Sequence, residues 1–359
     1  MLLSTPIGVC QLSTIYHNNT MHKGKLLLFL SFMLSITLLL SFQNYKSTPT
    51  ALSECGTSEN IYQCLSNYME LYAEKESITT SILELDKIKE VPKFAFYCHT
   101  LAHTLGVYGY NKFSSIPKAL GAGGKSCSDG YYHGVVEEGA RAMQMEEYAL
   151  AIDSYCDGLS DKLLNLDCVH GLGHGAFIAS KGDIPSGSNI CAGLQSSFDR
   201  LMCLSGLFMQ YSIDKRAAWL RGSLPSVIDV CDKKFTGTPK EYKDACLMNI
   251  FLQISINDFQ TNDFKIMRDL CSKYSGENLK SCYYGIGYAG PGLVNFEPRK
   301  IATIICGNQT DFASAKCVHR ESQAFGAVLG SKAMKKDLCP LFIPEQQIFC
   351  FEVKEYELR

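Results

Sequence analysis

Apolar residues recur every three or four positions along most of this chain, in segments separated by short polar stretches. Two such segments, 58–76 (SENIYQCLSNYMELYAEKE) and 78–90 (ITTSILELDKIKE), predict a pair of helices. Strict alternation of apolar and polar residues, which is typical of strands, is scarce. The pattern therefore predicts an all-α fold, and the segments in 45–90 are interpreted as a helical cap.

Cysteines mark a repeat in the second half of the chain. They fall in close pairs, and the second member of each pair recurs every 33 to 43 residues. The pairs are Cys156 and Cys168, Cys191 and Cys203, Cys231 and Cys246, Cys271 and Cys282, Cys306 and Cys317, and Cys339 and Cys350. Because the first cysteine ends an apolar segment and the second opens the next, each pair is expected to form a disulfide across an αα-turn.

Two further pairs extend this series toward the amino end. Cys127 matches the second-cysteine position, and Cys98 is its expected partner. Cys55 and Cys64 complete the set and leave Cys10 unpaired. Glycine recurs four places into the aligned segments, counted from the second cysteine, at Gly130, Gly171, Gly206 and Gly285. A glycine that returns at one helical position predicts close backbone approach to a neighbouring helix.

These features predict disulfide-stapled helical-hairpin repeats, arranged as an open α/α solenoid or as a closed α/α toroid. The expected organisation is a leader (1–20), a signal peptide or membrane anchor (21–44), the cap (45–90), histidine-rich hairpins (91–180) and further hairpins (181–359). The last three form one continuous domain. In a toroid, His319 would approach the histidines of the early hairpins, whereas in a solenoid it would lie far from them.

The amino-terminal segment predicts export. Residues 26–42 are uncharged and apolar, and they follow Lys23 and Lys25. This arrangement is typical of a signal peptide or of a membrane anchor with the remainder of the chain outside the cytoplasm, and Met21 is an alternative start. The abundance of cysteine, 17 in 359 residues, fits a secreted or membrane-anchored protein. A net charge of -2 without a basic block excludes a nucleic-acid partner.

Histidines are concentrated in the early hairpins. Three consecutive predicted helices each carry two possible metal ligands four residues apart, a spacing that places both on one helical face. These residues are His99 and His103, His133 and Glu137, and His170 and His174. Because equivalent positions of stacked hairpins lie side by side, the six side chains are expected to converge on a metal site.

The donor set suits zinc, copper, iron or nickel, bound as one crowded ion or as two ions. We expect a metal-dependent oxidoreductase or hydrolase, or a metal-binding chaperone, of the extracytoplasmic space. The alternative is a non-catalytic scaffold, similar to tetratricopeptide or Sel1 repeats, that binds a protein partner and whose histidines only pack. No serine-hydrolase, zinc-protease or haem-attachment motif is present to favour a particular reaction.

Overall fold

The computed structural model describes residues 52–354, apart from 125, 128–129, 160–161, 217–223, 255–258 and 309–310. Helices make up nearly all the regular structure of these residues, and no strand occurs among them, which confirms the all-α prediction. The chain divides into two units, Met1–Pro49 and Thr50–Arg359, and the architecture below is that of the second.

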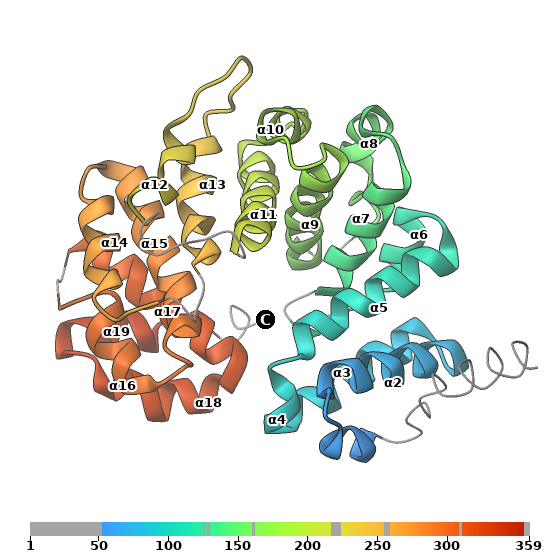
Figure 1. Ribbon diagram of the computed structural model, residues 1–359, viewed down its shortest axis with the longest axis horizontal. Helices are drawn as coiled ribbons and strands as arrows, with labels where there is room; N and C mark the ends of the chain where they lie inside the picture. Colours follow the sequence, from blue (N-terminus) through green and yellow to red (C-terminus); the bar gives the residue numbers. More distant parts are fainter. Residues whose placement is uncertain are drawn as a thin grey trace, which may run out of the picture. The chain divides into compact units, whose positions relative to one another are not determined.

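The second unit contains a series of helices, most of them long, that follow one another through the fold (Figure 1). These are α5 (Cys98–Phe113), α7 (Gly130–Ala142), α9 (Lys162–Ala179), α11 (Ser197–Lys215), α13 (Tyr242–Asn249), α15 (Gly276–Leu293) and α17 (Phe312–Leu329). Each packs against the next member of the series. The helical-repeat prediction is therefore confirmed at the level of packed neighbouring helices.

Further helices lie between the members of this series, and the last two follow α17. They are α6 (Ile116–Gly121), α8 (Met145–Ala151), α10 (Ile184–Ala192), α12 (Leu224–Val227), α14 (Asp263–Cys271), α16 (Pro298–Lys300), α18 (Ser331–Ala333) and α19 (Pro344–Phe351). The 3₁₀ segment η7 (Ile250–Gln253) extends α13. Before α5 lie η1 (Leu52–Thr57), α2 (Ile61–Lys75), α3 (Ile78–Glu90) and α4 (Pro92–Ala95), and α2 and α3 form the predicted hairpin.

Eight disulfides link consecutive elements, in the pairs that the sequence spacing indicates. They join Cys55–Cys64, Cys98–Cys127, Cys156–Cys168, Cys191–Cys203, Cys231–Cys246, Cys271–Cys282, Cys306–Cys317 and Cys339–Cys350. So many disulfides indicate an oxidising, extracytoplasmic environment.

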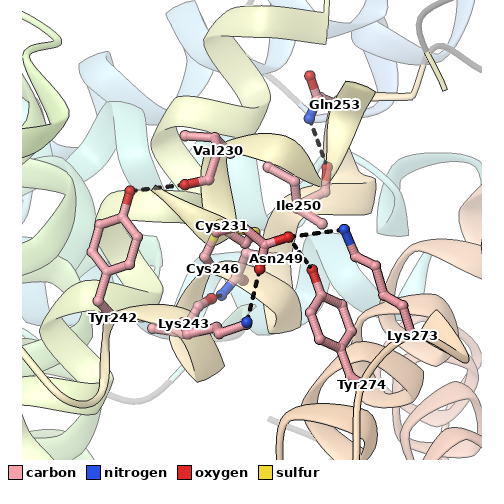
Figure 2. Close-up of a disulfide and its surroundings, with 12 residues drawn as sticks. Val230, Cys231, Tyr242, Lys243, Cys246, Asn249, Ile250, Gln253, Lys273 and Tyr274 are labelled. Carbon is pink, nitrogen blue, oxygen red and sulfur yellow. Dashed lines mark hydrogen bonds and ion pairs between the residues drawn. A yellow bond between two sulfur atoms is a disulfide. The ribbon is translucent and has the colours of Figure 1, made fainter. Parts of the chain in front are cut away.

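The surroundings of one disulfide show how a turn is held (Figure 2). Cys231 in the 3₁₀ segment η6 (Asp229–Asp232) is bonded to Cys246 in α13. Tyr242 donates a hydrogen bond to the Val230 carbonyl at 3.1 Å, and Lys243 forms an ion pair with Asp232 at 2.7 Å. The disulfide and the polar contacts thus fix the same turn.

The helices begin earlier than the sequence pattern suggests. The second cysteine of each pair was expected to open a helix, yet Cys203 and Cys317 lie well inside α11 and α17. The reason is capping: Ser196 accepts a hydrogen bond from the Asp199 backbone, and Asp311 accepts one from the Ser314 backbone. The polar stretches therefore contain the first helical turns.

The recurrent glycines lie at helix contacts. A Cβ on Gly206 would collide with the His170 carbonyl of α9, and one on Gly285 would collide with the Leu247 carbonyl of α13. At Gly130 the nearest atom would be the His99 carbonyl, at 2.6 Å. Gly171 differs, because its closest neighbour is the His133 ring at 3.3 Å. At three of the four predicted glycines, the backbone of one helix thus contacts the backbone of a neighbouring helix.

The predicted attachment to a membrane is corrected. Among the described residues, no helix combines the length and the apolar content that crossing a bilayer requires. The longest of them, α11, carries charged side chains near both ends. The apolar run 26–42, the basic residues before it and Cys10 lie outside the described residues. The membrane is accordingly withdrawn as a partner.

Candidate metal centre

Three consecutive helices of the series present histidines to one another. His99 and His103 lie on α5, His133 on α7, and His170 and His174 on α9. Glycines allow these helices to approach closely, because Gly134 of α7 packs directly against the His103 backbone. The five histidines form one group, called the histidine cluster below.

The rings of the histidine cluster lie in mutual contact. The ring centroid of His133 is 5.6 Å from that of His99, 5.2 Å from those of His103 and His170, and 4.8 Å from that of His174. His133 therefore occupies the middle, and it is only 5% exposed. Imidazoles separated by 71 residues of sequence, from His103 to His174, have centroids 6.4 Å apart.

Hydrogen bonds determine which ring nitrogens of α5 carry protons. Nδ1 of His99 donates to the Cys127 carbonyl at 2.9 Å, so Nε2 of a neutral His99 holds a lone pair. Nδ1 of His103 lies 3.3 Å from Oε1 of Glu137, which can only accept when ionised. When both rings are neutral, the two Nε2 atoms face each other at 3.1 Å with a lone pair on each.

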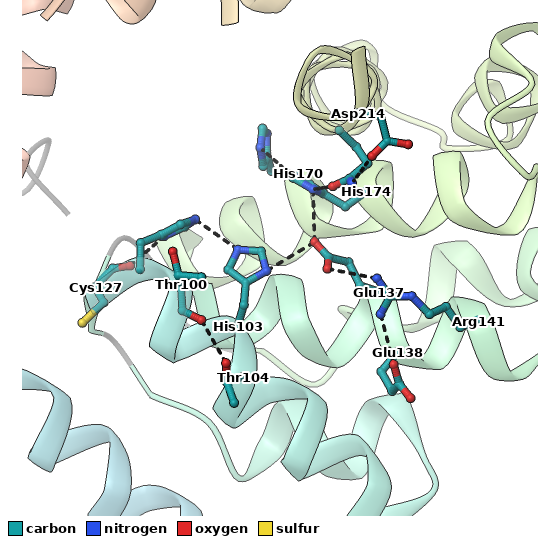
Figure 3. Close-up of polar contacts among 12 residues, drawn as sticks. Thr100, His103, Thr104, Cys127, Glu137, Glu138, Arg141, His170, His174 and Asp214 are labelled. Carbon is teal, nitrogen blue, oxygen red and sulfur yellow. Dashed lines mark hydrogen bonds and ion pairs between the residues drawn. The ribbon is translucent and has the colours of Figure 1, made fainter. Parts of the chain in front are cut away.

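The same arrangement recurs on α9 (Figure 3). Nδ1 of His174 faces two acceptors, Oε1 of Gln210 at 2.9 Å and Oε1 of Glu137 at 3.3 Å. In a neutral His174, Nε2 then holds a lone pair, and it points at Nε2 of His170, 3.4 Å away. Nδ1 of His133 is buried and has no hydrogen-bond partner. Such a set of unsatisfied nitrogen lone pairs fits a bound cation.

Two groups of three histidines have donor atoms close enough to share an ion. One group is His99, His103 and His133, and the other is His133, His170 and His174; within each, the donor atoms lie within 4.8 Å of one another. His133 belongs to both groups. The geometry thus fits one ion with several imidazole ligands or two ions with a common neighbour.

Glu137, predicted as a ligand, contacts the outer side of the cluster. Its carboxylate meets the Nδ1 atoms of His103 and His174, not the Nε2 atoms that face inward, and Arg141 lies 3.7 Å from its other oxygen. Burial favours a higher pKa for this carboxyl, but hydrogen bonds from His103 and His174 outweigh burial and hold the pKa below its usual range. An ionised carboxylate that orients two imidazoles is typical of the residues behind metal ligands.

The electrostatic environment favours neutral imidazoles, the form that binds metal. Burial, followed by the neighbouring His103, lowers the pKa of His99 to about 3. Burial and the adjacent rings also hold the pKa of His133 and that of His170 well below the ordinary value. The rings of His99, His133 and His170 are thus uncharged at neutral pH.

Several residues around the cluster had no signal in the sequence. Gln210 and the Cys127 carbonyl fix ring orientation, but a glutamine on α11 and a backbone oxygen look ordinary in a sequence. His319 contacts Gln323 and the Phe349 carbonyl. Burial, His174 and His99 lower the pKa of His170, and the charge of Arg320, next to His319 in the chain, adds to this shift.

A third group of possible ligands, Cys306, Cys317 and Glu321, does not fit a metal. The two cysteines are joined in a disulfide and offer no thiolate.

No protein-family model matches the chain, and no curated protein or solved structure does. Inferences about function therefore depend on the geometry of the described residues.

Proposed function

We propose that this chain is an extracytoplasmic metalloprotein whose histidine cluster binds one or two transition metal ions. The observation that carries the proposal is the pairing of Nε2 atoms, at 3.1 Å on α5 and 3.4 Å on α9, while the Nδ1 atoms face oxygen acceptors. Facing lone pairs repel each other, and a cation between them turns that repulsion into coordination.

The donor set restricts the metal. Imidazole nitrogen suits zinc, copper, iron and nickel, whereas calcium and magnesium prefer oxygen ligands. All sixteen described cysteines are in disulfides, so thiolate ligation is excluded among them. In this proposal the five histidines are the ligands, and Glu137 orients His103 and His174 and balances the charge of the ion.

We further propose that the site is catalytic and belongs to an oxidoreductase or hydrolase. A closed structural site has only protein ligands, whereas one histidine of this cluster, His99, also lines a cavity. Bound zinc would supply Lewis-acid activation of water, and copper or iron would supply redox chemistry. The chain's own contribution is to hold the imidazoles neutral, oriented and largely shielded from solvent.

Metal analysis of the purified full chain tests the proposal. After export to an oxidising compartment and exposure to zinc, copper or iron, the wild type should retain at least about one ion per chain. His133→Ala should lose most of the metal, because His133 belongs to both groups of three. His319→Ala is the matched control, since that histidine pairs with a glutamine outside the cluster.

Retention of only background metal by the folded wild type would contradict the proposal. The histidines would then be packing residues, and the scaffold interpretation would stand. Equal metal loss in His319→Ala and His133→Ala would also contradict it, because the loss would not depend on the histidine cluster.

A further inference from the structure

A cavity of about 640 Å³ adjoins the histidine cluster. Its wall includes His99 from α5, but most of it is apolar and comes from η7, α15 and α17. The apolar lining residues include Phe251, Leu252, Leu293, Phe296, Ala327 and Val328. A volume of this size is typical of sites that enclose a small organic molecule.

Two cations lie on the cavity wall. Arg216 and Arg320 both line it, and no aspartate or glutamate does so among the described residues. Nε of Arg216 donates to the neutral Leu252 carbonyl at 3.0 Å. The charge of Arg216 therefore has no carboxylate partner on the cavity wall that the described residues form. A mostly apolar cavity with positive charge and no lining acid favours an anionic ligand.

Arg320 is held in a fixed position. Its guanidinium carbon lies 4.0 Å from the ring centroid of Tyr288 and 4.9 Å from that of Tyr284. Stacking on aromatic rings fixes the plane of the guanidinium. Its Nε is buried and has no hydrogen-bond partner. The protein thus leaves one donor of this guanidinium unsatisfied.

A chain of side-chain hydrogen bonds orients the other end of Arg320. Nδ1 of His319 faces the Phe349 carbonyl at 3.2 Å, so Nε2 of His319 accepts from Nε2 of Gln323 at 3.1 Å. The Gln323 oxygen is thereby turned toward Arg320, whose Nη1 donates to it at 3.1 Å. The guanidinium is thus prepared before any ligand binds, which reduces the entropy lost on binding.

Arg320 and His99 lie on the wall of the same cavity. A ligand bound to the arginine would therefore lie in a cavity that one histidine of the cluster, His99, also lines.

We infer that the cavity binds a monocarboxylate with an apolar body, its carboxylate on Arg320 beside the histidine cluster and its body against α15 and α17. The planar guanidinium matches the two oxygens of a carboxylate, and the apolar wall matches a hydrocarbon or aromatic body. The role of this ligand as a substrate rests on the metal site proposed above, whereas its binding depends on Arg320 and the apolar wall.

Calorimetric titration of the full chain with decanoate and with decan-1-ol tests the inference. The two probes share an apolar body, and only decanoate carries a charge. Wild type should bind decanoate about tenfold or more tightly than the alcohol. Arg320→Gln should reduce decanoate affinity to that of the alcohol and leave alcohol binding unchanged, whereas Arg299→Gln, an exposed arginine on α16, should change neither.

A second variant tests the apolar wall. Ala327→Trp fills the cavity from α17 and should weaken the binding of both probes, and circular dichroism checks that each variant is folded. Absence of decanoate binding to the wild type, equal affinity for the two probes, or unchanged decanoate affinity in folded Arg320→Gln or Ala327→Trp would overturn the inference.

Performing the titrations on metal-free and metal-loaded protein separates the two proposals. Decanoate binding that depends on Arg320 in metal-free protein supports this cavity even if the chain retains no metal. Conversely, a protein that binds metal through His133 but does not bind decanoate refutes the carboxylate site and leaves the metal site intact.

Discussion

Glu137 links two helices of the histidine cluster through a single carboxylate oxygen. Oε1 lies 3.3 Å from Nδ1 of both His103 and His174, and the ionised form orients the two rings with their Nε2 atoms inward. The i and i+4 spacing on α7 made Glu137 a ligand candidate. Which nitrogen a carboxylate faces depends on side-chain rotamers, and a sequence pattern does not contain that information.

Glu137→Gln should therefore weaken metal binding without abolishing it. Glutamine keeps an acceptor oxygen but loses the charge, and removing a residue behind the ligands typically costs about 10- to 100-fold in metal affinity. Competition with a chelator measures the change. Glu138→Gln is the control. Glu138 forms an ion pair with Arg141 in which no cluster histidine takes part, so the substitution should change metal affinity little. Metal loss as complete as in His133→Ala would show that Glu137 is itself a ligand.

Glu321 on α17 is buried without compensation. It is 0% exposed and neither carboxylate oxygen has a hydrogen-bond partner. Burial raises its pKa well above the ordinary value, and the charge of Arg268 only partly opposes this shift. Below the ordinary pKa of a glutamate, the Glu321 carboxyl is protonated in both the folded and the unfolded chain. As pH rises above it, the unfolded chain ionises first, and the folded state loses relative stability.

Glu321→Gln should remove this pH-dependent loss. The variant should match the wild type near pH 4 and exceed its free energy of unfolding by about 1–3 kcal/mol at pH 8. Denaturant titrations at both pH values measure the difference, with the exposed Glu345→Gln as control. A variant that is less stable than the wild type at pH 8 would show that the ionised carboxylate has a partner that stabilises it.

At the scale of elements, glycines set the distance between helices. The recurrence of glycine after the second cysteine predicted close approach, and Gly206 meets the His170 carbonyl while Gly285 meets the Leu247 carbonyl. Gly134 and Gly173 make equivalent contacts from other positions, which recur in fewer of the aligned segments. The starts of the helices were also misjudged, because capping by Ser196 and Asp311 lies within stretches that look like turns.

Gly206→Ala should separate α11 from α9. The added Cβ would collide with the His170 carbonyl and lie 3.2 Å from Cδ2 of His174, so we expect a loss of about 1–3 kcal/mol in stability and weaker metal binding. Gly292→Ala is the control, because no atom lies within 4 Å of its added Cβ; it should be neutral or gain about 0.5–1 kcal/mol. Similar effects of both substitutions on denaturation and metal affinity would contradict this account.

At the scale of the whole molecule, the cysteine spacing predicted the repeat correctly, since a disulfide across a turn restricts both sequence distance and geometry. The toroid alternative would bring the region of His319 near the early histidines, but the sequence could not decide between toroid and solenoid and gave no sign of the cavity. This cavity brings His99 of α5 together with Arg320 of α17, and that meeting depends on the accumulated angles between all intervening helices. Small packing differences at each helix pair determine those angles, and no local pattern encodes them.

Removing single disulfides should separate overall stability from the metal site. Cys156→Ser with Cys168→Ser opens a link next to His170 on α9, and Cys339→Ser with Cys350→Ser opens one of similar length near the end of the chain. Each double variant should lose about 3 kcal/mol of stability in denaturation. Only the first should lower metal affinity, and an equal effect of the two on metal affinity would contradict the placement of the site.

The central claim is that imidazole nitrogens from three helices converge on a metal ion. X-ray absorption spectroscopy of the zinc-loaded full chain tests it most directly. We predict a nitrogen shell at about 2.0–2.1 Å with the outer scattering of several imidazole rings, reduced in His133→Ala. Sulfur scattering at about 2.3 Å, or an oxygen shell without imidazole features, would contradict the account.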